Sequence, residues 1–173
     1  MRRRVLISAT ILILTAVLGT ALFYCLYSHD NKYAGSIPAG VTKGTGEYVI
    51  NADHLPGPVF LVDGWEVYDG LTTDFANRNP LTTYIGEHSN FTYLNGSPYG
   101  EATYRLRLIN QGGENELSLR LPELLSASRV YINGRLASSQ GSLLPFRPLV
   151  RDVTVSFAAG AETEIVVQTA NKS

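Results

Sequence analysis

The feature that most constrains this chain is a run of 23 residues without a charge. Val5 to Tyr27 contain no Asp, Glu, Lys or Arg, and three arginines, Arg2 to Arg4, stand directly before them. As an α-helix with a rise of about 1.5 Å per residue, the run spans roughly 34 Å, which is enough to cross a hydrocarbon core of about 30 Å. Residues 1–28 are therefore predicted to form one transmembrane helix that acts as a signal anchor.

The charge before the apolar run predicts its orientation. Basic residues favour the cytoplasmic side, so the rest of the chain is expected at the cell membrane with its C-terminal domain outside the cytoplasm. A cleaved signal peptide has the same basic start, but its apolar region is usually about 7 to 15 residues long. The anchor is the preferred interpretation and the signal peptide is the alternative; both export the remaining residues.

The remaining residues have the composition of a folded, mildly acidic domain. The single cysteine, Cys25, lies in the apolar run, so the exported part has no internal disulfide and depends on its core. After Ser28, 11 basic and 15 acidic residues remain, a balance that argues against nucleic-acid binding. Residues 29–46 are rich in Gly, Ser and Thr and are predicted to be a linker, which leaves residues 47–173 for the domain.

Short β-rich runs separated by turn-forming residues predict an all-β domain. The runs are Tyr48–Asn51, Val59–Val62, Thr82–Ile85, Ala102–Asn110, Glu116–Leu121, Arg129–Ile132, Leu136–Ser139, Val150–Phe157 and Glu162–Thr169. Their spacing is typical of a β-sandwich or a barrel. No internal repeat is present, which argues against a propeller or a solenoid.

Local patterns predict how some of these runs connect. Residues 102–108 and 117–121 both alternate apolar and polar side chains, and the turn-forming residues between them predict that the two runs pair as a hairpin. Asn133-Gly134 predicts a type I′ hairpin turn, in which both central residues need a positive φ. Residues 122–126 are predicted to add one short helical turn.

The chain carries no motif that indicates catalysis or a metal site. The histidines His29, His54 and His88 are scattered without ligand spacing. The acidic stretch around Trp65 lacks the order of a calcium-binding loop, so we expect a solvated loop with Trp65 as a core residue. There is no nucleophile elbow and no phosphate-binding loop. The sequence therefore predicts a chain that is not an enzyme and has no cofactor or bound metal.

Loop residues are the candidates for contact with a ligand. Tyr93 and Tyr99 lie in a turn-rich segment, where a tyrosine offers a flat apolar face and a hydroxyl group. Arg147 lies between Phe146 and Pro148 in a second predicted loop. These three residues are the predicted ligand-binding residues. Tyrosines within alternating runs, such as Tyr104, are expected to pack in the sheet instead.

The order of five motifs resembles a known family. They are Gly64–Tyr68, Tyr99–Leu106, Leu119–Leu124, Ser126–Gly134 and Glu164–Asn171. This series resembles the extracellular sensor region of bacterial seven-transmembrane receptors with diverse intracellular signalling modules, and the likeness covers roughly Val62 to Asn171. The sugar-binding domain of family 2 glycoside hydrolases is similar. The resemblance implies a galactose-binding-like jelly-roll β-sandwich that binds a small ligand, with a carbohydrate as the first candidate.

The resemblance also implies a signalling role. In that family the sensor precedes a seven-helix membrane bundle and an output module such as a histidine kinase or a diguanylate cyclase, so we expect the sandwich to continue C-terminally and any output enzyme to lie beyond residue 173. The expected function is that of an extracytoplasmic ligand-binding sensor domain. Two alternatives remain open: a non-catalytic domain of a secreted family 2-like glycoside hydrolase, and an adhesion module without a small ligand.

Overall fold

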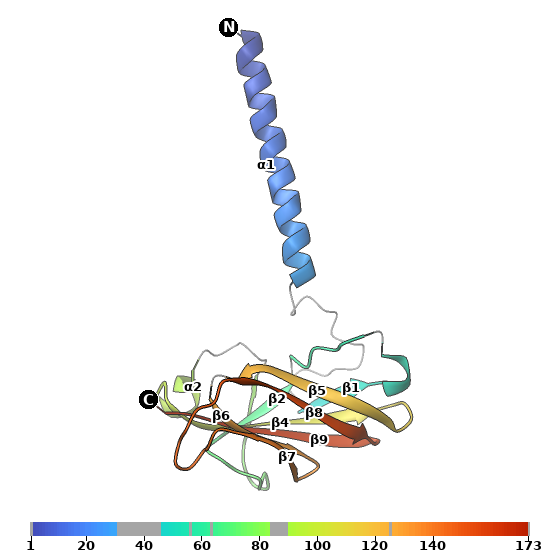
Figure 1. Cartoon of the computed structure of the whole chain (residues 1–173), viewed down its shortest axis with the longest axis vertical. Helices are drawn as coiled ribbons and strands as arrows, with labels where there is room; N and C mark the ends of the chain where they lie inside the picture. The colour runs from blue at the N-terminus through green and yellow to red at the C-terminus, as the bar shows by residue number, and fades with distance from the viewer. Residues whose placement is uncertain are drawn as a thin grey trace. The chain divides into compact units, whose positions relative to one another are not determined.

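The computed structural model describes residues 2–30, 46–55, 57–62, 64–83, 90–124 and 126–172. The chain divides into a helical unit and a β unit (Figure 1). In chain order, the described elements are α1 (Arg2–Asp30), β1 (Glu47–Ile50), the 3₁₀-helix η1 (Ala52–His54), β2 (Trp65–Asp69), β3 (Leu81–Thr83), α2 (Thr92–Asn95), β4 (Gly100–Asn110), β5 (Asn115–Leu124), β6 (Ala127–Ile132), β7 (Arg135–Gln140), β8 (Arg151–Ala159) and β9 (Glu162–Asn171). The predicted β-sandwich preceded by a helix is confirmed. The predicted linker lies mostly outside the described residues.

Between Val5 and Tyr27, the helix α1 carries no charged side chain on any side. Its segment Arg3–Tyr27 is long and apolar enough to cross a membrane, a property that a signal sequence shares. The Thr10 and Thr20 hydroxyls donate to the Leu6 and Ala16 carbonyls, at 3.0 and 2.9 Å. Because these donors are satisfied within the helix, the two threonines fit an apolar environment.

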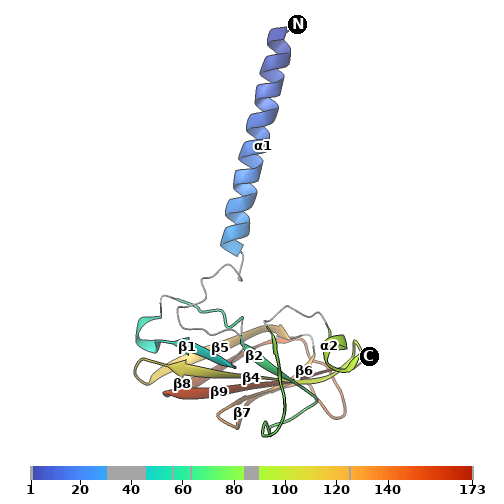
Figure 2. The ribbon, with the colours of Figure 1, turned by 180° about the vertical axis from the view of Figure 1, so that it is seen from behind.

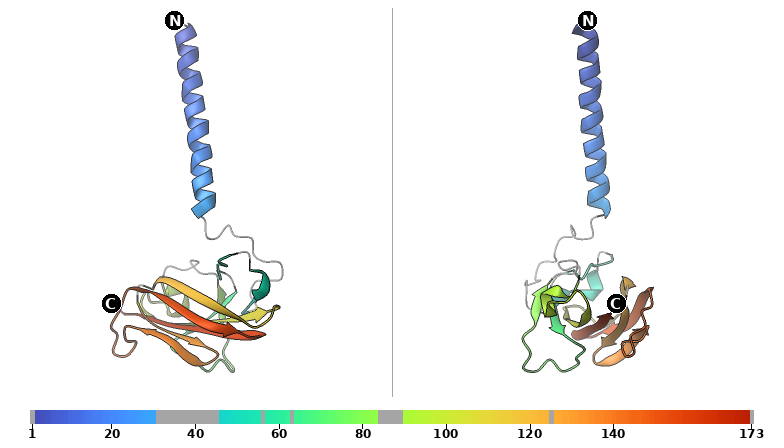
Figure 3. Two further views of the ribbon diagram at one scale, coloured as in Figure 1. Left: turned by 45° about the vertical axis from the view of Figure 1, so that its right-hand side comes forward. Right: turned by 90° about the vertical axis from the view of Figure 1, so that its left-hand side faces the viewer.

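The β unit consists of two sheets, whose strands lie in two layers (Figures 1 and 2). The large sheet has the order β3-β2-β4-β9-β6-β7. β1 runs parallel to β4 and pairs with residues 107–110, beyond the segment 102–105 that pairs with β2. The small sheet contains β5 and β8, joined antiparallel. Figure 3 shows these layers from two further directions.

The main core fills the space between the two sheets. Alternation along β4 turns Leu106 and Leu108 inward, where Val130 of β6 and Ile165 of β9 join them. Trp65 is 2% exposed, and its ring Nε1 donates to the Leu61 carbonyl at 2.8 Å. The prediction of Trp65 as a core residue is confirmed.

Two predicted features of the strands are wrong. The segment Val59–Val62 forms no strand: Val59 and Leu61 pack against the main core from a loop. The predicted hairpin of residues 102–108 with 117–121 does not form, because β4 pairs with β2 and β9 whereas β5 pairs with β8 in the other sheet. Each of the two strands has one apolar face. Because β4 and β5 lie in opposite sheets, their apolar faces meet in the main core and bury each other.

Two further local predictions are also corrected. Within the acidic stretch around Trp65, Glu66 and Asp69 belong to strand β2 rather than to a solvated loop, since Trp65 and Val67 face the core on either side of Glu66, whereas Asp74 lies in an exposed loop after it. The helical turn at residues 122–126 is absent, because β5 continues to Leu124. The turn at Asn133-Gly134 is confirmed: it joins β6 and β7 with φ angles of 49° and 74°. Asp63 and His88 lie outside the described residues.

Asp53 fixes the crossing from β4 to β5, and its contacts predict a pH dependence. The carboxylate accepts a hydrogen bond from the Gly113 N–H at 2.7 Å and another from the Asn115 side-chain amide at 2.7 Å. These bonds, the first above all, hold the pKa of Asp53 below its ordinary value. A carboxyl group with a lowered folded-state pKa stabilises the fold above its unfolded pKa, and the contribution disappears as the pH falls through the folded value.

We therefore expect wild type to unfold at a higher temperature than Asp53→Asn at neutral pH, with a difference that shrinks as the pH falls below about 4. Thermal unfolding of both proteins across this range measures it. A difference that stays constant down to about pH 2 would contradict the role given to the carboxylate.

Candidate functional site

The three predicted ligand residues lie at one end of the large sheet. The register pairs Gly100 with Asn171 and Ala127 with Ala170 there. α2 and the C-terminal end of the chain lie at this end (Figure 1), which we call the α2 end. Tyr93 belongs to α2 and Tyr99 directly precedes β4. Arg147 lies in the connection from β7 to β8, whose ends, Gln140 and Arg151, are also at the α2 end.

Tyr93 packs on the inner face of the large sheet. It contacts a small cluster formed by Val67, Phe91 and Ala102. Its hydroxyl lies 3.4 Å from the hydroxyl of Tyr104, which is partly buried between this cluster and the main core. The ring of Tyr93 therefore packs against the sheet and only its hydroxyl group is available for a hydrogen bond, so the ring is not an exposed surface for a ligand to stack on. The prediction that Tyr104 packs in the sheet is confirmed.

Arg147 belongs to a loop that packs on the opposite face. Leu143, which is 1% exposed, and Phe146 contact Ala127 and Ala170 on the outer face of the sheet. Two backbone hydrogen bonds between Ser142 and Arg147, of 2.9 and 2.8 Å, close the loop. The structure thus places Tyr93 and Arg147 over different faces.

Tyr99 is 48% exposed and stands near the edge between these two faces, just before β4. Its N–H donates to the Ser97 hydroxyl at 3.1 Å. The three residues share one end of the sheet without forming a common site, and their binding role stays a prediction.

Ion pairs occupy the outer face of β2, β4 and β9. Arg105 lies 3.1 Å from Glu66 and 2.7 Å from Glu164, with the ring of Phe75 4.6 Å from its guanidinium. Burial works against the charge, but the Glu164 carboxylate and Tyr68 hold the pKa of Arg105 above its ordinary value. Arg105, Glu66 and Glu164 are therefore paired with one another, and none of the three is free to pair with a charged ligand.

The inner face changes character at the α2 end. Directly opposed residues of neighbouring strands point to the same side of a sheet. The register therefore aligns Ala102 of β4, Thr169 of β9, Ser128 of β6 and Gln140 of β7. We call these four residues the polar row. The next aligned set toward the middle of the sheet, Tyr104, Val167 and Val130, is mostly apolar.

The polar row contains hydrogen-bonding groups that lack partners among the described residues. The Ser128 hydroxyl and the Gln140 Oε1 atom are buried without a partner there, in residues that are 1% and 6% exposed. The Gln140 amide nitrogen donates to the Asp152 carbonyl at 3.3 Å, and the Thr169 hydroxyl lies 2.6 Å from that of Ser126. A buried polar atom left without a partner costs about 1 to 3 kcal/mol, a cost that a water molecule or a hydrogen-bonding ligand offsets. Arg107 Nε and Thr163 Oγ1 are in the same state elsewhere among the described residues, and the polar row is where two such atoms lie on opposed residues of neighbouring strands.

The polar row could have been found as a break in alternation. Val130 and Ile132 are buried apolar residues of β6, and the equivalent inward position before them is Ser128. In β9, Ile165 and Val167 are followed at the same spacing by Thr169. In both strands a polar residue thus occupies a position where the alternation calls for an apolar one, and this is the signal of the polar row in the sequence.

Metal binding finds no support in the part of the chain that the structure describes. Within it, no three His, Cys, Asp or Glu side chains gather closely enough to hold an ion. His54 is exposed at the end of η1. The side chains of His29 and His88 are outside the description. The groups at the polar row are hydroxyls and an amide, which bind a ligand by hydrogen bonds without bond chemistry.

No family model matches this chain, and no curated protein matches it. Solved structures that are similar to it include a Bacteroides fragilis protein described as a candidate beta-galactosidase (21% identity, TM-score 0.47), an FMN-binding beta-glucuronidase from Faecalibacterium prausnitzii (13%, 0.46) and a beta-D-glucuronidase from Dictyoglomus thermophilum (16%, 0.45). The matches cover 65%, 65% and 64% of this chain and 18%, 18% and 19% of those chains. The chain thus matches a portion of much longer proteins.

Proposed function

We propose that the β unit binds a small, uncharged ligand rich in hydroxyl groups, with a carbohydrate as the first candidate, at the polar row. The observation that carries this proposal is the pair of buried polar atoms, Ser128 Oγ and Gln140 Oε1, without partners among the described residues. A hydroxyl-rich ligand supplies both donors and acceptors, so it satisfies a hydroxyl and an amide oxygen together.

The chemistry of the neighbouring residues supports a neutral ligand. The four residues of the polar row are uncharged, and the nearest aligned charge, the Asp69 carboxylate opposite Ala102 on β2, is exposed to solvent. A buried ligand charge would be costly without a partner. The ring of Tyr104 is partly buried one position further into the sheet, and its hydroxyl lies beside that of Tyr93. An aromatic face next to hydroxyl groups suits a sugar, which has both apolar C–H surface and polar groups.

We propose further that the chain is the extracytoplasmic sensor part of a membrane signalling receptor, such as a sensor histidine kinase or a diguanylate cyclase. The apolar helix α1 and the sequence resemblance support this role. Binding would act by favouring one of two receptor states, which requires that the ligand bind the two states with different affinity. The rival proposal is a non-catalytic domain of a secreted glycosidase, with the same kind of ligand and no retained anchor.

Thermal unfolding of the full chain in detergent micelles tests the binding proposal. Suitable probes are glucose, galactose, mannose, maltose and cellobiose, with galacturonate and glucosamine as charged counterparts. A ligand at 100 times its Kd stabilises the folded state by about 2.7 kcal/mol, which raises the melting temperature of a domain this size by several degrees. We expect at least one neutral sugar to do so and the charged counterparts to do less. A shift with galacturonate alone would contradict a neutral site.

Alkaline carbonate extraction of membranes from cells that express the full chain separates the two roles. An uncleaved α1 keeps the protein in the membrane pellet, because a spanning helix resists extraction. We expect the protein in the pellet, with its N-terminus intact by mass spectrometry. A soluble protein that has lost α1 would contradict the anchored sensor and favour the secreted alternative.

A further inference from the structure

The loop between β7 and β8 exposes an unusual group of apolar side chains. Leu144, Leu149 and Val150 are 69%, 48% and 60% exposed within seven residues. Single exposed apolar residues are common, but a group of them marks an interaction surface. We propose that this loop, residues 141–150, binds the surface of a lipid bilayer that carries anionic headgroups.

The fold holds the loop in a fixed shape. Leu143 and Phe146 pack against the outer face of the sheet, and the backbone bonds between Ser142 and Arg147 close the turn. Gly141 begins the loop with a φ of 60°, where an added Cβ would collide with the Arg147 carbonyl. Because two apolar side chains anchor the loop, the other three remain on its outer side.

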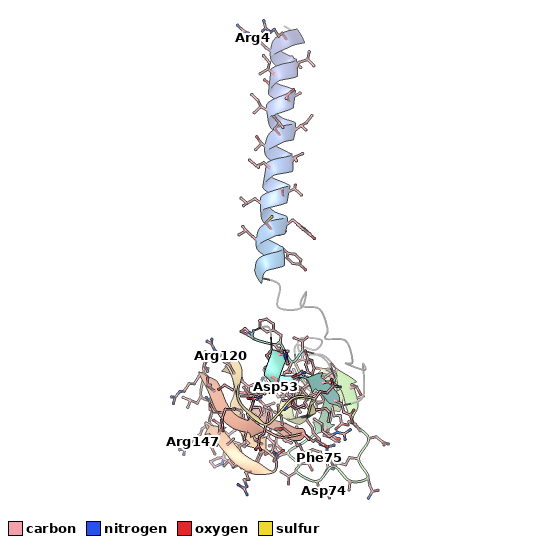
Figure 4. All side chains as sticks on the ribbon, turned by 90° about the vertical axis from the view of Figure 1, so that its right-hand side faces the viewer. Arg4, Asp53, Asp74, Phe75, Arg120 and Arg147 are labelled. Carbon is pink, nitrogen blue, oxygen red and sulfur yellow. The ribbon has the colours of Figure 1, made fainter. Side chains whose placement is uncertain are left out.

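The charge around the loop is complementary to an anionic surface. Residues 141–151 contain two arginines, Arg147 and Arg151, and no acidic residue. Arg147 and Arg151 are exposed beside the apolar group. The acidic residue that follows, Asp152, lies 2.7 Å from Arg120, so these two opposite charges offset each other. Figure 4 shows Arg120 and Arg147 on the side of the domain away from Asp74 and Phe75.

A bilayer is the favoured partner because a retained α1 would hold the β unit close to the membrane. This inference rests on the proposed retention of α1 as an anchor, and it is independent of the polar row. The 16 residues between Asp30 and Glu47 can span at most about 55 Å. That exceeds the diameter of roughly 36 Å expected for a compact domain of this size, so the length of the connection permits the loop to reach the membrane. Leucine and valine beside arginine suit the boundary between headgroups and acyl chains.

The test uses the full chain with Cys25→Ser and one new cysteine, Leu144→Cys, labelled with the environment-sensitive dye NBD. The protein is reconstituted into vesicles of phosphatidylcholine, with or without about one third phosphatidylglycerol. Vesicle lipids with a nitroxide near the headgroup quench a dye that reaches the interface. The matched control is Leu136→Cys, which is 57% exposed near the β6–β7 turn, at the other end of the sheet.

We expect several-fold stronger quenching at position 144 than at position 136, and only when phosphatidylglycerol is present. Replacing Arg147→Gln or Arg151→Gln is expected to lower the ratio of bound to free loop about fivefold each. Equal quenching at the two positions overturns the proposal, as does quenching that is the same without phosphatidylglycerol. Because α1 stays in the reconstituted protein, loss of the anchor cannot produce these negative results, and sugar binding is measured separately.

Discussion

Replacing Trp65 by alanine is expected to lower the free energy of unfolding by about 3 to 5 kcal/mol. The indole is 2% exposed in the main core, so its loss removes a large buried apolar surface and leaves a cavity. It also removes the donor to the Leu61 carbonyl, which holds the segment before β2 over the sheet. Since Trp65 is the only tryptophan, unfolding should be followed by far-UV circular dichroism rather than by fluorescence.

Two variants control this measurement. Trp65→Phe keeps an aromatic ring but loses the hydrogen bond to Leu61, so we expect a smaller loss of about 1 to 3 kcal/mol. Phe60→Ala removes a neighbouring aromatic side chain that is 50% exposed, and its effect should stay within about 0.5 kcal/mol. If Trp65→Ala were no more destabilised than Phe60→Ala, the core described here would be wrong.

Asn110→Ala is expected to lower the free energy of unfolding by about 2 to 4 kcal/mol, although only a polar side chain is removed. Asn110 is 7% exposed. Its Oδ1 accepts from the N–H groups of Ala52 and Gly112, at 3.0 and 2.9 Å. Its Nδ2 donates to the carbonyls of Gly113 and Ala159, at 2.8 and 3.3 Å. Alanine leaves these four backbone groups, from three separate segments, without that partner.

Asn110→Asp separates the two halves of this network. An aspartate keeps an acceptor for the Ala52 and Gly112 N–H groups but has no donor for the carbonyls of Gly113 and Ala159. At neutral pH we expect chemical denaturation to give a lower free energy of unfolding for both variants than for wild type. The values for the two variants should differ, because aspartate loses only the donor half of the network and alanine loses both halves. An alanine variant as stable as wild type would show that water replaces Asn110 at no cost.

The sequence predicted most strands and the hairpin of β6 with β7, but it did not predict the partners of β4 and β5. Alternation identifies the apolar side of a strand, whereas the neighbour depends on which layers bury that side. For these two strands the chain crosses between the sheets, and the crossing depends on the side chains of Asn110 and Asp53. Strand β2 was missed because Glu66 reads as a solvated residue until Arg105, 39 positions away, is placed beside it.

The candidate site was less accessible to prediction than the fold. Loop position directed attention to Tyr93, Tyr99 and Arg147, which the structure places at one end of the sheet but over different faces. The polar row exists only because three strands align Thr169, Ser128 and Gln140. The breaks in alternation at Ser128 and Thr169 are visible in each strand, but only the pairing of the strands shows that these two residues and Gln140 lie side by side.

Calorimetric titration of the full chain with the sugar that gives the largest thermal shift tests the central claim most directly. The titration compares wild type with Ser128→Ala and with Ser156→Ala, an exposed serine of β8 that is bonded to Ser118 on the outside of the small sheet. The proposal predicts that Ser156→Ala binds like wild type and that Ser128→Ala binds about tenfold more weakly, as loss of one hydrogen bond in a buried site implies. Absence of binding to wild type, or equal affinities of all three proteins, would contradict a ligand site at the polar row.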